Sequence, residues 1–197
     1  AISEYALDLK NPFVGMYFDK TAGVSKRLPI PIDDIHKVQH LCRTIDDDLR
    51  WLVALISDTG MRLAEGAGLL KNDIILDADI PHISLKPHPW RPLKTSGSQR
   101  DVPLVGASLW AAQSLSESFP DSPYAFPRYN RKDTTNSNSA SAALNKWLHQ
   151  YVPVGCTMHS FRHSMRDRLR AVECPSDVIA LAKPKPIDVI YFLQGYG

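Results

Sequence analysis

The chain has 197 residues, of which 44% are hydrophobic, and this suffices for one folded domain with a short leading segment. Its formal charge of +2 neither requires nor excludes a polyanionic partner. Three cysteines without a close pair argue against a disulfide framework or a zinc site, and the lack of a long apolar run argues against a membrane helix. We therefore expect a cytoplasmic protein that does not act at a membrane.

Residues 1–31 predict a linker or tail. Two proline-containing stretches, Asn11-Pro12-Phe13 and Leu28-Pro29-Ile30-Pro31, interrupt a segment of mixed polarity that also contains glycines. We expect residues 32–197 to form one domain.

Two helices and a shorter one should follow the linker. Residues 33–42 and 46–59 carry apolar side chains at helical spacing, and Thr59-Gly60 ends the second helix. A short helix is expected over residues 62–70.

Between Ile80 and Leu104 the apolar residues alternate with polar ones, and Ser96-Gly97-Ser98 breaks the middle, which predicts an antiparallel hairpin or a three-stranded sheet. Beyond it we expect helices over 104–119, through 142–148 and over 157–172, with a polar loop over 128–141. The sequence thus predicts an α+β fold, mainly helical, with a small antiparallel sheet.

Arg62 is the first candidate site residue. It follows Thr59-Gly60 at the start of a predicted helix, where backbone N–H groups favour an anion, and a guanidinium group can form two parallel hydrogen bonds to a phosphate. Glu65 lies on the same helical face and is placed to orient this guanidinium. Taken alone, the pair is more typical of an ordinary surface ion pair.

His159 and Arg162 lie on one face of a later predicted helix, so both can reach one target. Histidine exchanges a proton near neutral pH, whereas arginine holds its charge. Their spacing alone is common by chance, and a solvated basic face is the alternative. That face, which also carries His163, Arg166, Arg168 and Arg170, would itself favour nucleic acid.

Lys94 is expected on a strand beside the Ser-Gly-Ser turn, from where a long ammonium group can protonate a leaving oxygen. A lysine in a hairpin is otherwise usually a device that keeps an edge strand soluble.

Three motifs, taken in chain order, resemble those of the tyrosine recombinase (phage integrase) family. They are the segment from Thr59 to Glu65, then Lys94 followed by the segment from Arg100 to Leu104, and then the segment from His159 to His163. The residues around Pro12 and Leu28 resemble that family's linker between a DNA-clamping domain and the catalytic domain.

The resemblance implies roles for these residues. Arg62, His159 and Arg162 would surround the scissile phosphate, Lys94 would protonate the leaving 5′ oxygen, and Glu65 would act as a structural buttress. It also implies double-stranded DNA as partner, a homo-tetramer on the DNA, accessory DNA-bending proteins, and no metal or other cofactor.

The family's nucleophile is a tyrosine near the C-terminus, and Tyr196 lies at a fitting distance after Arg162 in a Gln-Gly-Tyr-Gly context. Tyr191 is the alternative nucleophile, although packing beside Phe192 would equally explain it. The histidine or tryptophan that the family carries before this tyrosine would fall near Lys185, where a Lys-Pro-Lys-Pro stretch stands instead.

The function implied is site-specific integration or excision of DNA, as of a prophage, through a 3′-phosphotyrosyl intermediate. Two alternatives stay open. One is relaxation of DNA in the manner of a type IB topoisomerase, which uses the same residues. The other is a DNA-binding module with a degenerate active site, which the Lys-Pro-Lys-Pro stretch favours.

Overall fold

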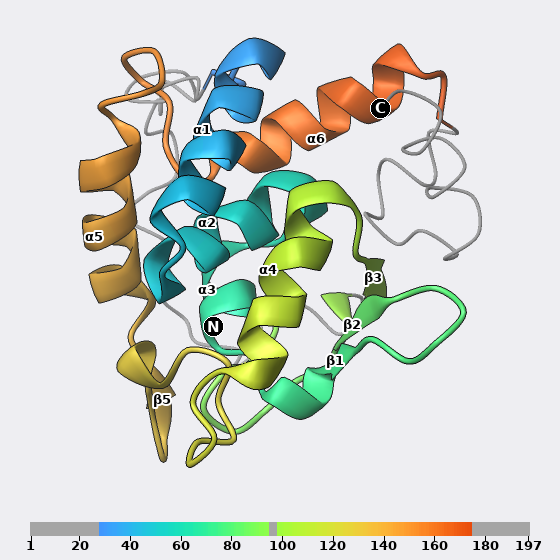
Figure 1. Ribbon diagram of the computed structural model, residues 1–197, viewed down its shortest axis with the longest axis vertical. Coiled ribbons are helices and arrows are strands. Elements are labelled where there is room, and N and C mark those ends of the chain that lie inside the picture. The colour runs from blue at the N-terminus through green and yellow to red at the C-terminus, as the bar shows by residue number, and fades with distance from the viewer. Residues whose placement is uncertain (1–27, 95–97, 175–197) are drawn as a thin grey trace, which may run out of the picture.

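The computed structural model describes residues 28–94 and 98–174 as a mainly helical α+β domain, which confirms the predicted fold class (Figure 1). None of the helices in these two ranges is long and apolar enough to cross a membrane. The helices are α1 (Ile32–Ile45), α2 (Asp48–Thr59), α3 (Leu63–Ala67), α4 (Gly106–Glu117), α5 (Ser137–Leu148) and α6 (Ser160–Ala171).

A small antiparallel sheet, with strand order β1-β2-β3, lies beside the helices, as predicted. It consists of β1 (Ile74–Ile75), β2 (His82–Leu85) and β3 (Arg100–Pro103). A 3₁₀ turn, η1 (Lys71–Asp73), leads into β1. Ile83 of β2 pairs with Val102 of β3, and Leu85 pairs with Arg100 at the last position of this ladder. This register places Arg100 at the end of the sheet.

Helix α2 is the centre of the core and packs against α1, α4 and α6. It is buried along most of its length, because apolar residues occupy more than one of its faces. Its neighbour α1 is amphipathic and buries only the face that carries Ile35, Val38 and Cys42.

The end of α2 allows α6 to pack closely against it. Gly60 ends α2 with a φ of 60°, and a Cβ atom at this position would lie 3.0 Å from the Cβ of Met165 on α6. Only glycine fits both the left-handed backbone and the short separation. The start of α6 therefore lies against the segment that leads from α2 into α3.

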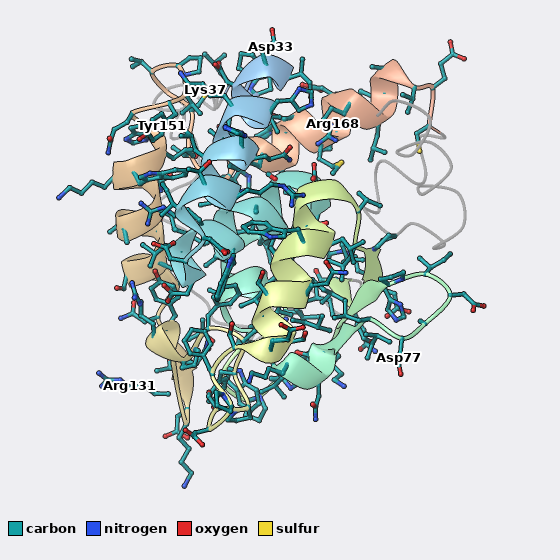
Figure 2. All side chains as sticks on the ribbon, viewed as in Figure 1. Asp33, Lys37, Asp77, Arg131, Tyr151 and Arg168 are labelled. Atoms are coloured by element: carbon teal, nitrogen blue, oxygen red, sulfur yellow. The ribbon has the colours of Figure 1, made fainter. Side chains whose placement is uncertain are left out.

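A single carboxylate connects three helices. Asp58 near the end of α2 is 6% exposed, and its Oδ2 accepts a hydrogen bond of 2.9 Å from the N–H of Ala107 in the first turn of α4. Its Oδ1 accepts one of 3.0 Å from Nη1 of Arg168, which Figure 2 labels on α6. Asp58 thus fixes α4 and α6 relative to α2.

Several predicted helix boundaries differ from the observed ones by two or three residues, and two of the differences have a clear local cause. The second helix begins at Asp48 rather than Asp46, because the side chain of Asp47 caps it by accepting a hydrogen bond of 2.9 Å from the N–H of Arg50. The short helix predicted over 62–70 ends at Ala67, since Gly68 no longer has helical geometry and the chain then turns into η1.

The polar loop predicted over residues 128–141 was also wrong. The segment contains part of the 3₁₀ turn η3 (Pro127–Tyr129) and a hairpin of two short strands, β4 (Asn130–Arg131) and β5 (Thr134–Thr135). Helix α5 starts within it as well, because Asn136 caps the helix by accepting a hydrogen bond of 3.0 Å from the N–H of Ser139.

Residues 1–27, 95–97 and 175–197 lie outside the described residues. Most of the predicted linker over residues 1–31 and both candidate nucleophiles, Tyr191 and Tyr196, fall in these ranges.

The link through Asp58 leads to a prediction about stability. Asp58→Ala removes the acceptor for the α4 amide and leaves Arg168 without its carboxylate, so we expect urea denaturation to show a loss of about 2 to 3 kcal/mol. The matched control is Asp167→Ala on α6, whose ion pair with Arg170 is exposed, and it should change stability by less than about 0.5 kcal/mol. Equal losses in the two variants would contradict the role given to Asp58.

Candidate functional site

Arg62 is the N-cap residue of α3, as the sequence predicted, and its side chain is 33% exposed. Its Nη1 lies 2.7 Å from Oε1 of Glu65, and its backbone N–H donates to Oε2 of the same carboxylate at 2.9 Å. Glu65 therefore holds both the backbone and the side chain of Arg62, and the guanidinium group keeps a face toward solvent.

Glu65 is shared with a second arginine, Arg100 at the start of β3. Nη2 of Arg100 lies 3.0 Å from Oε2 of Glu65, and both side chains are about 95% buried. Burial by itself would raise the pKa of Glu65, but the charge and hydrogen bond of Arg100 and the hydrogen bonds from Arg62 outweigh it and lower the pKa. Glu65 is thus ionised at neutral pH.

Arg162 in the first turn of α6 joins this pair. Its Nη1 donates a hydrogen bond of 2.8 Å to the carbonyl oxygen of Gly60, which precedes Arg62 by two positions. Burial, followed by the guanidinium groups of Arg62 and Arg100, lowers the pKa of Arg162. The contact with Gly60 brings the guanidinium group of Arg162 to the segment that carries Arg62, although the two arginines are far apart in the chain.

The cluster carries an excess of positive charge. The guanidinium groups of Arg62 and Arg100 share one carboxylate, that of Glu65, while Arg162 is held beside them at the carbonyl oxygen of Gly60. Arg166 adds a further positive charge that acts on Arg162. Like charges held together at partly buried positions are relieved when an anion binds. Guanidinium groups also match the geometry of phosphate oxygens, so the cluster is suited to a phosphate.

His159 lies directly before α6 as its N-cap residue, partly buried. Its carbonyl oxygen accepts a hydrogen bond of 3.1 Å from the N–H of Arg162, and its ring packs edge to face on that of His163 with centroids 5.2 Å apart. The structure thus places His159 within one helical turn of Arg162, at the same end of α6.

Lys94 does not lie on a strand, contrary to the expectation. The ladder between β2 and β3 closes at the Leu85–Arg100 pair, so Lys94 is in the connection between these strands, where it is exposed. The physical reason is proline: Pro87, Pro89 and Pro92 lack the N–H that would continue the ladder.

The part that Arg100 plays was not predicted. In the sequence, Arg100 is the first residue of a strand motif, and nothing there gave its side chain a role in the site. Its inward direction depends on the register of β3 against β2, which is a long-range feature. A basic residue at the start of a strand that ends in buried apolar residues was the one available signal.

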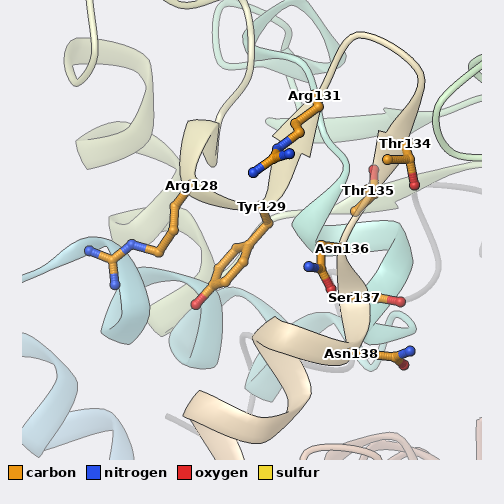
Figure 3. A pocket seen from close by; sticks show the side chains of 8 residues that line it. All are labelled: Arg128, Tyr129, Arg131, Thr134, Thr135, Asn136, Ser137 and Asn138. Carbon is orange, nitrogen blue, oxygen red and sulfur yellow. The ribbon is translucent and has the colours of Figure 1, made fainter.

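A polar hollow of about 410 Å³ lies elsewhere on the domain, between η3, the β4–β5 hairpin and the start of α5 (Figure 3). It shares no residue with the arginine cluster. One of its arginines, Arg128, is engaged by Asp48 at 3.1 Å. The lining residues are Arg128, Tyr129, Arg131, Thr134, Thr135, Asn136, Ser137 and Asn138.

Comparison with solved structures shows what the fold resembles. The Tn1549 transposon integrase in complex with a circular intermediate DNA superposes with a TM-score of 0.65 over 100% of this chain and 69% of that chain, at 15% identity. A second such complex gives 0.60 over 89% of this chain and 64% of that chain, at 14% identity. XerA recombinase superposes with a TM-score of 0.56 over 98% of this chain and 71% of that chain, also at 14% identity.

At these identities the likeness shows a shared fold, and this chain spans about two thirds of the length of those chains. No curated protein matches the sequence.

The model of the phage integrase family matches residues 31–182. This range is more than half of the chain and contains all the residues of the arginine cluster as well as Lys94 and His159. The chain therefore belongs to the phage integrase family.

Proposed function

We propose that this protein breaks and rejoins DNA at defined sites as a tyrosine recombinase, and so integrates or excises DNA. The observation that carries the proposal is that Arg62 and Arg100 share the carboxylate of Glu65, while the guanidinium group of Arg162 is held at the carbonyl oxygen of Gly60, two residues before Arg62. Such a cluster is more cationic than a structural ion pair needs, and it matches one phosphodiester.

Arg62 and Arg162 bind the non-bridging oxygens of the scissile phosphate. These oxygens gain negative charge as the phosphorus becomes five-coordinate, so fixed cations stabilise the transition state more than the ground state. Arg100 acts from behind Glu65, since its side chain is buried and its guanidinium group holds that carboxylate.

The phenol oxygen of Tyr196 attacks the phosphorus and forms a 3′-phosphotyrosyl bond while the bond to the 5′ oxygen breaks. His159 accepts the phenol proton, and Lys94 gives a proton to the leaving 5′ oxygen. A phenol has a pKa near 10, so the surrounding positive charge also favours its ionised form. The energy of the phosphodiester bond is conserved in the covalent link, so the proposed reaction requires no metal or other cofactor.

Double-stranded DNA is the proposed partner. Arg166 is exposed on α6, one turn after Arg162, and the polar hollow in Figure 3 adds Arg131, an exposed arginine suited to a backbone phosphate. In this proposal residues 32–197 are the catalytic part, residues 1–31 lead from a DNA-clamping domain, and the chains act as a homo-tetramer on DNA with accessory DNA-bending proteins.

The nucleophile is tested by trapping on a nicked duplex that loses the 5′ product and so accumulates the covalent complex. Tyr196→Phe should abolish the complex, because the attacking oxygen is gone, while leaving DNA binding intact. Tyr191→Phe is the matched control and should keep the complex. A complex that survives in Tyr196→Phe but is lost in Tyr191→Phe would move the nucleophile to Tyr191.

A chain that binds the duplex but forms no covalent complex would instead be a DNA-binding module. Strand exchange between two defined sites, measured on the same protein, separates recombination from the relaxation of supercoiled DNA.

The phosphate site is tested by Arg62→Ala and Arg162→Ala. Each removes a cation that faces the transition state, so we expect the rate of covalent complex formation to fall at least about 10²-fold. Arg170→Ala is the control, since Arg170 lies on the same helix as Arg162 but is paired with Asp167. Comparable losses in Arg170→Ala would mean that the arginines contribute only general attraction to DNA.

The electrostatic role of Glu65 gives a dependence on pH. Its pKa is lower in the folded chain than its ordinary value of 4.5, so its charge stabilises the fold above pH 4.5 and this contribution is lost as the pH falls through the folded pKa. Glu65→Gln should therefore be less stable than the wild type at pH 7, by about 3 kcal/mol. Urea denaturation should show this difference shrinking below pH 4.5, and a difference independent of pH would contradict the argument.

A further inference from the structure

A buried ionic cluster lies behind the arginine site, between η1 and the connection from β2 to β3. Asp73 is fully buried, and its Oδ2 accepts hydrogen bonds of 2.8 Å from Nε2 of His88 and 3.1 Å from the N–H of Leu70. Nη2 of Arg91 lies 3.4 Å from the same oxygen, and Nζ of Lys86 lies 3.7 Å from Oδ1. No step of the proposed reaction uses these residues.

Arg91 connects this cluster to the helix that carries the phosphate site. Its side chain is 1% exposed, and its Nε donates a hydrogen bond of 3.2 Å to the carbonyl oxygen of Gly68, directly after α3. A Cβ atom at Gly68 would lie 2.5 Å from Cδ of Arg91, so the guanidinium stem packs directly against the backbone. Arg91 is therefore packed against the residue that directly follows α3, the helix whose first turn carries Arg62 and Glu65.

The same residues fix the first half of the β2–β3 connection. The N–H and carbonyl groups of His88 and Arg91 exchange two hydrogen bonds, of 3.1 and 3.0 Å, and so close a tight turn. Nη2 of Arg91 donates a hydrogen bond of 2.9 Å to the carbonyl oxygen of Lys86. The ring of His88 stacks on that of Trp90 with the ring centroids 4.7 Å apart. The indole N–H of Trp90 donates a hydrogen bond of 3.2 Å to the carbonyl oxygen of Gly68.

Lys94 follows this turn with only Pro92 and Leu93 between it and Arg91. Proline fixes its own φ, and Leu93 packs against the hydrophobic core, so little freedom remains in this short stretch. A buried ion pair adds little net stability over apolar packing, which leaves geometry as its main contribution.

We propose that Asp73, His88 and Arg91 are positioning residues that hold Lys94 at a fixed place relative to Arg62 by tying its segment to the end of α3. The inference rests on the proposed function, in which Lys94 protonates the leaving oxygen. Proton transfer needs hydrogen-bond reach, and a misplacement of 1 Å can cost about 10²-fold in rate.

The chemistry of the leaving group offers a selective readout. When the bond from phosphorus to the 5′ oxygen breaks, this oxygen takes the proton of the Lys94 ammonium group. If sulfur replaces the 5′ oxygen, the bond from phosphorus to sulfur breaks and a thiolate departs without needing a proton. A duplex with a 5′-bridging phosphorothiolate therefore bypasses Lys94, and any residue that acts by placing Lys94, but it does not bypass Arg62.

The experiment measures single-turnover formation of the covalent complex by the full chain on the oxygen and sulfur duplexes. Lys94→Ala should be about 10²-fold or more slower than wild type on oxygen and close to wild type on sulfur. His88→Ala and Arg91→Met should each be about tenfold slower on oxygen and recover on sulfur. His88→Gln should stay near the wild-type rate, because its amide N–H can replace the Nε2–H donor to Asp73.

Two controls frame the result. Arg62→Ala should be slow on both duplexes, and Arg43→Met should be unaffected on both, since Arg43 packs over Trp110 away from the cluster. Urea denaturation checks that each variant is folded. If Arg91→Met fails to fold, the result of His88→Ala decides whether the proposal holds, because His88→Ala is a milder substitution at the edge of the cluster.

Equal loss on both duplexes by folded His88→Ala would overturn the proposal and leave the cluster a structural element, while recovery of Lys94→Ala on sulfur would still support the proposed function. If Lys94→Ala does not recover on sulfur, Lys94 is not the general acid and the positioning role falls with it. Recovery of both Lys94→Ala and His88→Ala on the sulfur duplex supports Lys94 as the general acid and the cluster as what positions it.

Discussion

The arginine site depends on one buried negative charge. In the part of the chain that the structure describes, the carboxylate of Glu65 contacts Arg62 at the start of α3 and Arg100 of β3, with Arg162 of α6 held beside them, and without this charge the repulsion between the three guanidinium groups would oppose the folded state. The carboxylate balances only part of that charge. The folded domain therefore keeps an excess of positive charge at one place, and the proposed anion site rests on this residual charge.

Each guanidinium group reaches the cluster through a different structural device. Arg62 is held by the start of α3, Arg100 by the end of the β2–β3 ladder, and Arg162 by a hydrogen bond to the carbonyl oxygen of Gly60. The place of Arg162 in turn depends on α2, because Asp58 near its end and Gly60 directly after it hold α6 in place. The core helix thus helps to set the geometry of the site without contributing a side chain to its chemistry.

Much of this could be predicted from local sequence. Apolar periodicity indicated the long helices, and Thr59-Gly60 predicted both the end of α2 and the start of the helix at Arg62. Long-range features could not be predicted in this way: the inward direction of Arg100 follows from strand register, and the place of Lys94 follows from a ladder that ends before the prolines. The hairpin after Tyr129 was missed because its strands are polar and only two residues long each. The role of Tyr196 stays a prediction, since this residue lies outside the described ranges.

The hydrogen bond from Arg162 to the carbonyl oxygen of Gly60 has a consequence for binding thermodynamics. An arginine side chain loses about 2 kcal/mol of rotamer entropy when it is ordered. Here much of that loss occurs as the chain folds, because one donor is already engaged while the others stay available. Binding of a phosphate at the proposed site would therefore be opposed less by side-chain entropy than binding at a free surface arginine.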